Sequence, residues 1–289
     1  MTKRSQAHIY VALCILLWAM IPVSAKLGQN SLDNHQYLFY SSLISFITLF
    51  FITLYNKKIN LIFSYSLKDI ITVIILGFLG TYIYYLFLYL GYKEAIGLEV
   101  LVVQYLWPIL IVIFSIFILK EKMTRLKSIS VALGFLAVMI TLTKGNLTQI
   151  DITNLPVIIL VFLGASSFAL FSVLSKKITL EPMGVTTIYF LVATIASFIS
   201  MLYFSELKYP NQTEYFPIIL NGVFLNGISY LLWIKALKLV DASYLAPFIF
   251  ITPILSAFYL ILFFDEPIYI SYIIGLVLVI VSGIINKGK

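Results

Sequence analysis

Long apolar runs that carry almost no charge are the feature that most constrains this chain. Each run has about 20 residues, the length that a helix needs to cross the hydrocarbon core of a bilayer. Ten such runs lie near residues 8–27, 36–55, 69–90, 98–119, 126–143, 155–175, 184–204, 215–235, 242–264 and 268–286. The breaks between them are too short to hold a soluble domain. We therefore expect an all-α membrane protein with ten transmembrane helices.

The composition supports the same class. Hydrophobic residues make up 62% of the 289 residues, charged residues make up 11%, and the mean hydropathy is +1.05. A soluble domain carries about 25% charged residues, so this chain could not cover a soluble surface. The first run follows "MTKR" and ends in "VSA", as a signal peptide would. It is longer than a usual signal and many similar runs follow, so we interpret it as the first span.

The basic residues predict the orientation, because Lys and Arg gather in cytoplasmic loops. With the N-terminus inside, 15 of the 19 Lys and Arg residues fall on the cytoplasmic side, and the outside keeps Lys26, Lys93, Lys144 and Lys208. The net charge of +7 is then explained by these loops without a nucleic-acid partner. We expect an integral multi-pass protein of the cytoplasmic (inner) membrane with both termini in the cytoplasm.

The two halves of the chain resemble each other weakly. A shift of 150 residues lays Lys26 on Lys176, and a shift of 145 lays Tyr85 on Tyr230, Lys93 on Lys238, Pro108 on Pro253 and Glu121 on Glu266. Each half holds five spans, and an odd number forces the second half to enter the membrane from the opposite side. The sequence thus predicts two inverted five-helix repeats, residues 1–146 and 147–289. Inverted repeats allow a carrier to alternate around a site at the midplane.

Polar and large aromatic side chains recur at helical spacing within several spans. A polar group left unsatisfied in hydrocarbon costs several kcal/mol, so such residues mark helix contacts or a wet cavity. The candidates for substrate binding or cavity lining are Trp18, Tyr85, Tyr89, Gln104, Trp107, Asn226, Tyr230 and Trp233. The alternative is that their hydroxyls and amides only join helices, at about 1 kcal/mol each. Tyr92, near a span end, we interpret as an interfacial anchor.

Three prolines lie inside predicted spans. Each removes the hydrogen bond to the carbonyl four residues earlier and permits a bend. Pro22, Pro108 and Pro253 are therefore candidates for hinge or gating positions, with a static bend as the alternative. The correspondence of Pro108 and Pro253 between the halves favours the hinge.

The residue types that are missing narrow the function. No Asp, Glu, Lys or Arg lies deep within a predicted span, so a buried carboxylate for proton relay is not expected. The residues expected to line a transport pathway are uncharged and largely aromatic. Such a lining favours neutral or zwitterionic substrates with an apolar part. The chain has two His, a single Cys (Cys14) and no HExxH, GxSxG or Walker A motif. We expect no enzyme, no cofactor and no metal, and we expect Glu121 to cap a helix or to pair within the loops.

The chain resembles the drug/metabolite transporter superfamily, in particular carriers with two EamA-type repeats. The resemblance covers almost the whole chain and rests on the Trp18–Lys26 segment, "LKEK" at 119–122, and Gly275 and Gly283 after Glu266. "EVLVVQYLWPIL", residues 99–110, resembles the span-four motif of bacterial aromatic amino-acid exporters. The resemblance implies a central cavity with Tyr105, Trp107 and Pro108 near its wall. Ser130 stands where a glycine matching Gly275 is expected, and the first span lacks the buried Glu of small multidrug carriers.

These observations predict a secondary transporter that exports amino acids, aromatic or otherwise neutral or zwitterionic, or related small metabolites. An uptake carrier or exchanger for another small metabolite or drug is the alternative, because an inverted repeat is reversible. A membrane-embedded enzyme is a more distant alternative. The expected partners are a small-molecule substrate and the lipid bilayer, with monomer and homodimer both left open.

Overall fold

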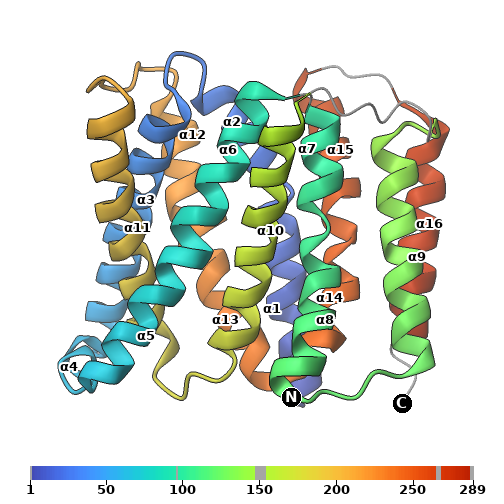
Figure 1. Ribbon diagram of the computed structural model, residues 1–289, viewed down its shortest axis with the longest axis horizontal. Coiled ribbons are helices and arrows are strands. Elements are labelled where there is room, and N and C mark those ends of the chain that lie inside the picture. The colour runs from blue at the N-terminus through green and yellow to red at the C-terminus, as the bar shows by residue number, and fades with distance from the viewer. Residues whose placement is uncertain (1, 96, 147–153, 265–267, 287–289) are drawn as a thin grey trace.

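The computed structural model describes residues 2–95, 97–146, 154–264 and 268–286, and all regular elements in these ranges are helices (Figure 1). Within this part of the chain, nine helical segments are long and apolar enough to cross a membrane. A tenth, α16 (Ile270–Asn286), is shorter and equally apolar in character. The predicted fold class is thus confirmed: an all-α membrane protein with ten spans.

In the first repeat, several spans are built from more than one helical piece. Its elements are α1 (Lys3–Trp18) and α2 (Ile21–Gly28) in span one, α3 (Asn34–Tyr55) in span two, the short connecting α4 (Ile59–Ile62), α5 (Leu67–Gly77), the π-helix η1 (Phe78–Ile83) and α6 (Tyr84–Glu94) in span three, α7 (Gly97–Gln104) and α8 (Trp107–Leu119) in span four, and α9 (Arg125–Leu142) in span five.

The second repeat follows the same plan. Its elements are α10 (Leu155–Ser175) in span six, α11 (Pro182–Phe204) in span seven, α12 (Tyr215–Leu220), the π-helix η3 (Asn221–Ile228) and α13 (Ser229–Leu239) in span eight, α14 (Ala242–Ile249) and α15 (Ile251–Phe264) in span nine, and α16 in span ten.

The two repeats run in opposite directions. In Figure 1, α1 begins at the lower end of the bundle, whereas α10, the first helix of the second repeat, begins at the upper end. The N-terminal end of α1 and the C-terminal end of α16 both lie at the lower edge of the bundle in Figure 1, which we call the termini end. We call the opposite end the vestibule end. The first helix of each repeat packs against the third span of the other, α1 on α13 and α10 on α6.

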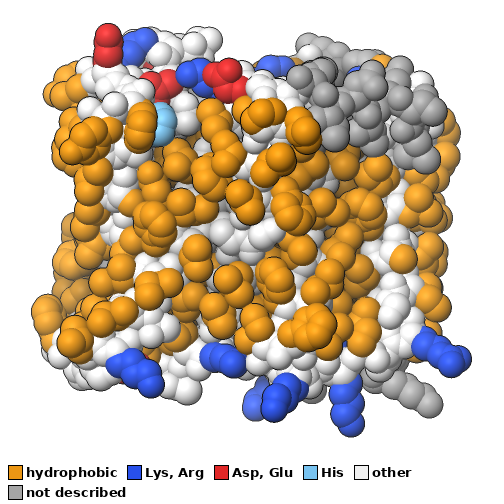
Figure 2. Space-filling view, in the orientation of Figure 1, with side chains coloured by type: hydrophobic (Ala, Val, Ile, Leu, Met, Phe, Trp, Pro, Cys, Tyr) orange, Lys and Arg blue, Asp and Glu red, His pale blue; other side chains and the backbone are white. Residues whose placement is uncertain are grey.

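The surface confirms an integral multi-pass membrane protein. Figure 2 shows a broad apolar face across the middle of the bundle, with Lys and Arg side chains along its termini end. Large apolar side chains are strongly exposed on the protein surface, for example Phe117 (77%) and Leu262 (64%). Such a surface is stable only against lipid, because its exposure to water would cost about 25 cal/mol per Å².

Polar caps fix where several helices start. The Asp33 carboxylate accepts from the backbone N–H of Gln36, and the Gln36 side chain accepts from the backbone N–H of Asp33, which together cap α3. Ser66 and Asp69 cap α5 in the same reciprocal way. These bonds satisfy backbone donors that the helix itself leaves unpaired.

Repeat-related glycines let the third spans approach the second span of the other repeat. A Cβ on Gly77 would lie 2.8 Å from the backbone Cα of Tyr189 in α11. Gly222, its partner at the shift of 145 residues, is equally crowded, because a Cβ there would lie 2.5 Å from the Ile44 Cβ in α3. Both contacts involve backbone or branch-point atoms that cannot rotate away.

We predict that Gly77→Ala and Gly222→Ala each lower the stability of the protein by about 1–3 kcal/mol, the usual cost of overpacking. Thermal unfolding in detergent, followed by size-exclusion chromatography, measures the effect. Gly283→Ala is the matched control, because its Cβ would lie 3.6 Å from the nearest side-chain atom and alanine favours the helix. Equal melting temperatures for all three variants would contradict the close approach.

Candidate functional site

A small cavity lies between the two repeats, near the middle of the bundle. Its volume is about 20 Å³, room for the centre of about one water molecule. The lining side chains are mostly aromatic and uncharged: Trp18, Ile21, Pro22, Tyr84, Tyr85, Tyr92, Gln104, Tyr105, Trp107, Phe168, Tyr230, Ile249 and Thr252. They come from both repeats.

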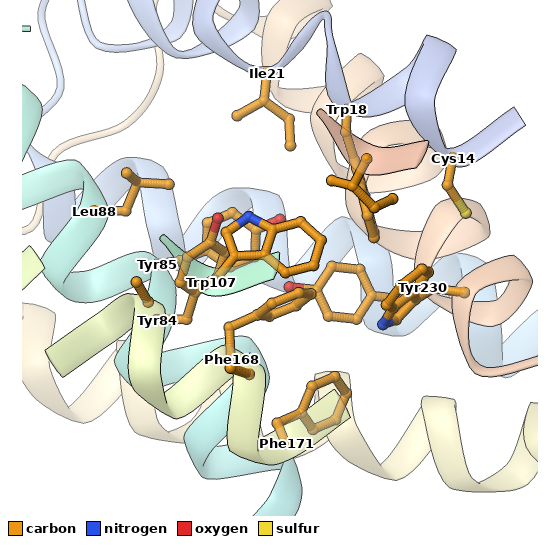
Figure 3. Packing of buried hydrophobic residues seen from close by; sticks show 14 of the residues in the cluster. Cys14, Trp18, Ile21, Tyr84, Tyr85, Leu88, Trp107, Phe168, Phe171 and Tyr230 are labelled. Atoms are coloured by element: carbon orange, nitrogen blue, oxygen red, sulfur yellow. The ribbon is translucent and has the colours of Figure 1, made fainter. Parts of the chain in front are cut away.

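Aromatic rings pack closely around this cavity. The Trp18 and Trp107 ring centroids are 6.0 Å apart, and the Trp107 ring lies edge-on to Phe168 at 4.9 Å. Figure 3 shows Trp107, Phe168 and Tyr230 gathered together, with Trp18 and Ile21 above them. Edge-to-face pairs of this kind add about 0.5–1.5 kcal/mol beyond the burial of apolar area.

Helix breaks position the lining residues. Trp18 ends α1 and Ile21 begins α2; Gln104 ends α7 and Trp107 begins α8. In span nine, Ile249 ends α14 next to the cavity. A helix carries partial positive charge at its N-terminus and partial negative charge at its C-terminus. The cavity therefore combines apolar walls with both signs of partial charge.

The three predicted hinge prolines lie at these breaks. Pro22 and Pro108 occupy the first turns of α2 and α8. Pro253 lies in the first turn of α15, just after the break at Phe250. Proline fits a first helical turn because the backbone N–H there has no partner within the helix. The geometry fits a bend, and the hinge role stays a prediction.

Gln104 joins two helices and lines the cavity at the same time. Its amide nitrogen donates to the Tyr84 hydroxyl at 2.9 Å, and its carbonyl oxygen accepts from the Tyr92 hydroxyl at 3.0 Å. The Tyr230 hydroxyl donates to the backbone carbonyl of Gly80 at 3.0 Å. The Thr252 hydroxyl, which also lines the cavity, is buried and has no protein partner. It is a polar group that a bound molecule could satisfy.

The structure brings most of the predicted site residues together. Those that line the cavity are Trp18, Tyr85, Gln104, Tyr105, Trp107 and Tyr230. Trp233 lies one layer behind, 5.5 Å from Trp18 between ring centroids, and its indole N–H donates to the Ser172 hydroxyl at 3.1 Å.

Tyr89 and Asn226 lie outside this lining, in a separate buried polar cluster. The Asn221 amide donates to the Tyr89 hydroxyl at 3.2 Å. Asn226 is fully buried on η3, and neither atom of its side-chain amide has a hydrogen-bond partner. We therefore place these two residues on the third spans of the two repeats, outside the cavity wall.

Several lining residues were missed from sequence. Tyr92 lines the cavity, so the interpretation as an interfacial anchor does not describe its position. Thr252 is the repeat partner of Trp107, and this correspondence could have predicted it. Phe168 lies in span six among other apolar residues, and no pattern in the sequence distinguishes it.

A larger open space, the vestibule, leads from the cavity to the vestibule end. It has a volume of about 600 Å³ and shares Pro22 and Tyr92 with the cavity lining. Its wall is partly polar and includes the charged side chains of Lys26, Asp33 and Lys93. A small molecule could therefore pass between this end and the aromatic cavity.

Toward the termini end, the cavity is closed by contacts between α1 and α13. The indole N–H of Trp18 donates to the Ser229 hydroxyl at 2.8 Å, and the Cys14 thiol donates to the Ser229 carbonyl at 3.2 Å. Among the described residues, no group of three or more His, Cys, Asp or Glu could hold a metal ion.

Comparison with known proteins places this geometry among transporters. The sequence model of the EamA-like transporter family matches residues 5–143 and 155–286. The uncharacterized transporter YyaM of Bacillus subtilis is 24% identical over 76% of this chain and 74% of its own. The aromatic amino acid exporter YddG of Ancylobacter novellus is 26% identical over 64% of this chain and 65% of its own. One solved crystal structure, 19% identical, shares the fold with a TM-score of 0.87 over 98% of this chain and 96% of that chain.

All three tryptophans of the chain lie in or against the cavity, at 6%, 3% and 0% exposure for Trp18, Trp107 and Trp233. We predict that the intrinsic fluorescence of the purified protein is blue-shifted and resists quenching by acrylamide, because the three indoles are buried among other side chains. Unfolding in a denaturing detergent serves as the control and should shift the emission to the red. Strong quenching of the folded protein would contradict the burial of the three indoles.

Proposed function

The chain belongs to the EamA-like transporter family, and we propose that it is a secondary transporter that exports neutral or zwitterionic amino acids, aromatic ones included, by alternating access. The observation that carries the proposal is the uncharged aromatic cavity built at the helix breaks of both repeats. The proposal treats the chain as a carrier rather than an enzyme and assigns it no cofactor.

The cavity suits the two parts of an amino acid differently. Aromatic walls such as Trp107 and Tyr230 favour an apolar or aromatic side chain. The N-terminus of α8 favours a carboxylate, and the C-terminus of α7 favours an ammonium group. Both helix ends belong to the same break, between Gln104 and Trp107. A zwitterion matches this arrangement without a charged side chain in the wall.

Two further observations favour aromatic amino acids. The "QYLWP" segment, residues 104–108, supplies Gln104, Tyr105 and Trp107 to the cavity and resembles the motif of aromatic amino-acid exporters. A relative that is 26% identical also carries the name aromatic amino acid exporter. Uptake or exchange of another small metabolite is the alternative, because inverted repeats work in either direction.

The present cavity is too small for an amino acid, so the site must widen before such a substrate can bind. A volume of about 20 Å³ fits about one water molecule, whereas the vestibule above it offers about 600 Å³. We propose that the site widens when spans one and four bend at their prolines, Pro22 in α2 and Pro108 in α8.

We predict that the protein, reconstituted in liposomes, catalyses saturable counterflow of labelled phenylalanine or another neutral amino acid. Trp107→Ala and Tyr230→Ala should each lower the rate about tenfold or more, because a buried aromatic anchor contributes about 2 kcal/mol or more to binding. Counterflow needs no knowledge of the driving force, so it tests substrate recognition alone.

Lipid-facing aromatics provide matched controls for these variants. Phe117→Ala, on the same helix as Trp107, and Tyr203→Ala should retain wild-type flux, since both side chains are at least 77% exposed in the apolar surface. Trp107→Phe and Tyr230→Phe keep most of the packing and guard against simple misfolding. Absence of saturable flux for every neutral amino acid would refute the proposed substrate class.

We also propose that the termini end faces the cytoplasm, because Lys and Arg line it (Figure 2). In a Cys14→Ser background, Gln212→Cys should react with a membrane-impermeant maleimide in intact cells. Lys57→Cys should react only after the cells are opened. Both positions are exposed and lie at opposite ends of the bundle. The reverse pattern would invert the orientation.

A further inference from the structure

The two ends of the bundle differ at repeat-related positions. Tyr92, Leu101 and Leu260 line the open vestibule. Their partners at the shift of 145 residues lie near the termini end and are fully buried, with 0% exposure: Leu237, Ala246 and Ser115. Equivalent surfaces are thus apart at one end and packed together at the other.

One carboxylate ties the closed termini end together. Glu121 follows α8 in the first repeat, and its side chain is 6% exposed. One oxygen accepts from the backbone N–H of Ala242 at 2.9 Å. The other accepts from the backbone N–H of Ser243 at 3.0 Å and from its hydroxyl at 2.6 Å. Glu121 therefore caps the N-terminus of α14, a helix of the second repeat, where a negative charge is favoured.

A lysine from a third segment completes this contact. The Lys176 ammonium, at the end of α10, lies 3.4 Å from the Glu121 carboxylate and also donates to the backbone carbonyl of Val240. Lys127 of α9 reaches the same place, 3.6 Å from Asp241 and 3.0 Å from the Ser243 hydroxyl. Asp241 is 57% exposed, so water screens its pairs more than those of Glu121.

The repeat partner of Lys176 has a different environment. Lys26, at the shift of 150 residues, is exposed in the vestibule wall, and its ammonium lies 3.9 Å from the centre of the Phe264 ring. Glu266, the partner of Glu121, lies outside the described residues. Lys176, which pairs with Glu121, thus lies at the closed termini end, whereas its partner Lys26 is exposed at the open vestibule end.

We propose that Glu121 is a latch that holds the termini end closed and that must release α14 and Lys176 before this end can open. The inference rests on the transport function proposed above, because only a carrier that alternates needs this end to open. Burial raises the pKa of the Glu121 carboxyl, but hydrogen bonds from Ser243 and Ala242 and the charge of Lys176 outweigh it and hold the pKa below its ordinary value. The carboxylate that caps α14 is therefore charged at neutral pH.

Opening can be measured without any substrate, from the reactivity of single cysteines in a Cys14→Ser background. Ser115→Cys is a small change at a buried position of the closed end, and Leu260→Cys reports on its repeat partner in the vestibule. With Glu121 intact, we expect a soluble maleimide to label Leu260→Cys quickly and Ser115→Cys slowly.

Glu121→Gln should shift the population toward opening at the termini end. We expect the labelling rate of Ser115→Cys to rise about tenfold or more, since hydrogen bonds to a charged group are lost, and that of Leu260→Cys to fall. Lys176→Gln, which leaves the cap on α14 in place, should act in the same direction but less. This second variant keeps the test open if Glu121→Gln does not fold.

Glu181→Gln is the matched control. Glu181 caps α11 at the same end, accepting from the backbone N–H groups of Met183 and Gly184 at 2.8 and 3.1 Å, but within the second repeat alone. It should leave both labelling rates unchanged. An unchanged Ser115→Cys rate in Glu121→Gln, or an equal rise in Glu181→Gln, would overturn the latch. Altered labelling without amino-acid flux would instead refute only the proposed substrate.

Discussion

The hydrogen-bonding demand of the backbone in hydrocarbon governs this structure. Every N–H and C=O at membrane depth needs a partner inside the protein, so helices can break only where other protein or a wet cavity surrounds the break. The breaks at Met20, Leu106 and Phe250 all lie beside the aromatic cavity. The two π-helices, η1 and η3, immediately precede Tyr85 and Tyr230 on their spans and occupy corresponding places in the two repeats. Irregular backbone and candidate site therefore coincide for one physical reason.

The sequence predicts the fold well because hydropathy is summed over about 20 residues, and a single side chain hardly changes the sum. The ten expected spans agree with the observed helices to within a few residues. The site is harder to predict, since it depends on which side of each helix faces the centre. Tyr89 and Tyr85 are one turn apart on α6, yet Tyr85 lines the cavity whereas Tyr89 contacts Asn221. Residues one turn apart share a face of a helix, so depth along the helix, and not only its rotation, decides which side chain reaches the cavity. Both are set by packing, which no single-chain pattern reveals.

Glycine and serine explain how the aromatic centre can be so crowded. The α3 helix approaches η3 through Ser41 and Ser45, with Gly222 and Gly227 on the other side. Small residues let helix backbones come close where lipid offers no hydrophobic driving force for association. The second and third spans pack tightly, whereas the first, fourth and ninth spans carry prolines at their helix breaks, which is where we expect bending. Close packing and helix breaks thus involve different residue types.

Charged and uncharged side chains also lie at different depths in the membrane. The described cavity wall carries no charged side chain, whereas Glu121, Lys176 and Asp241 meet at the termini end and Lys26 and Lys93 lie in the vestibule. A substrate can then enter the centre without displacing an ion pair in a medium of low dielectric constant, where such a step is costly. Charged contacts at the ends lie nearer to water, so breaking them costs less. In the mechanism proposed here, recognition depends on aromatic and amide groups at the middle, and the choice of open end depends on charges at the rim. This division lets substrate preference change by substitution in the cavity while the opposing contacts that close each end stay in place.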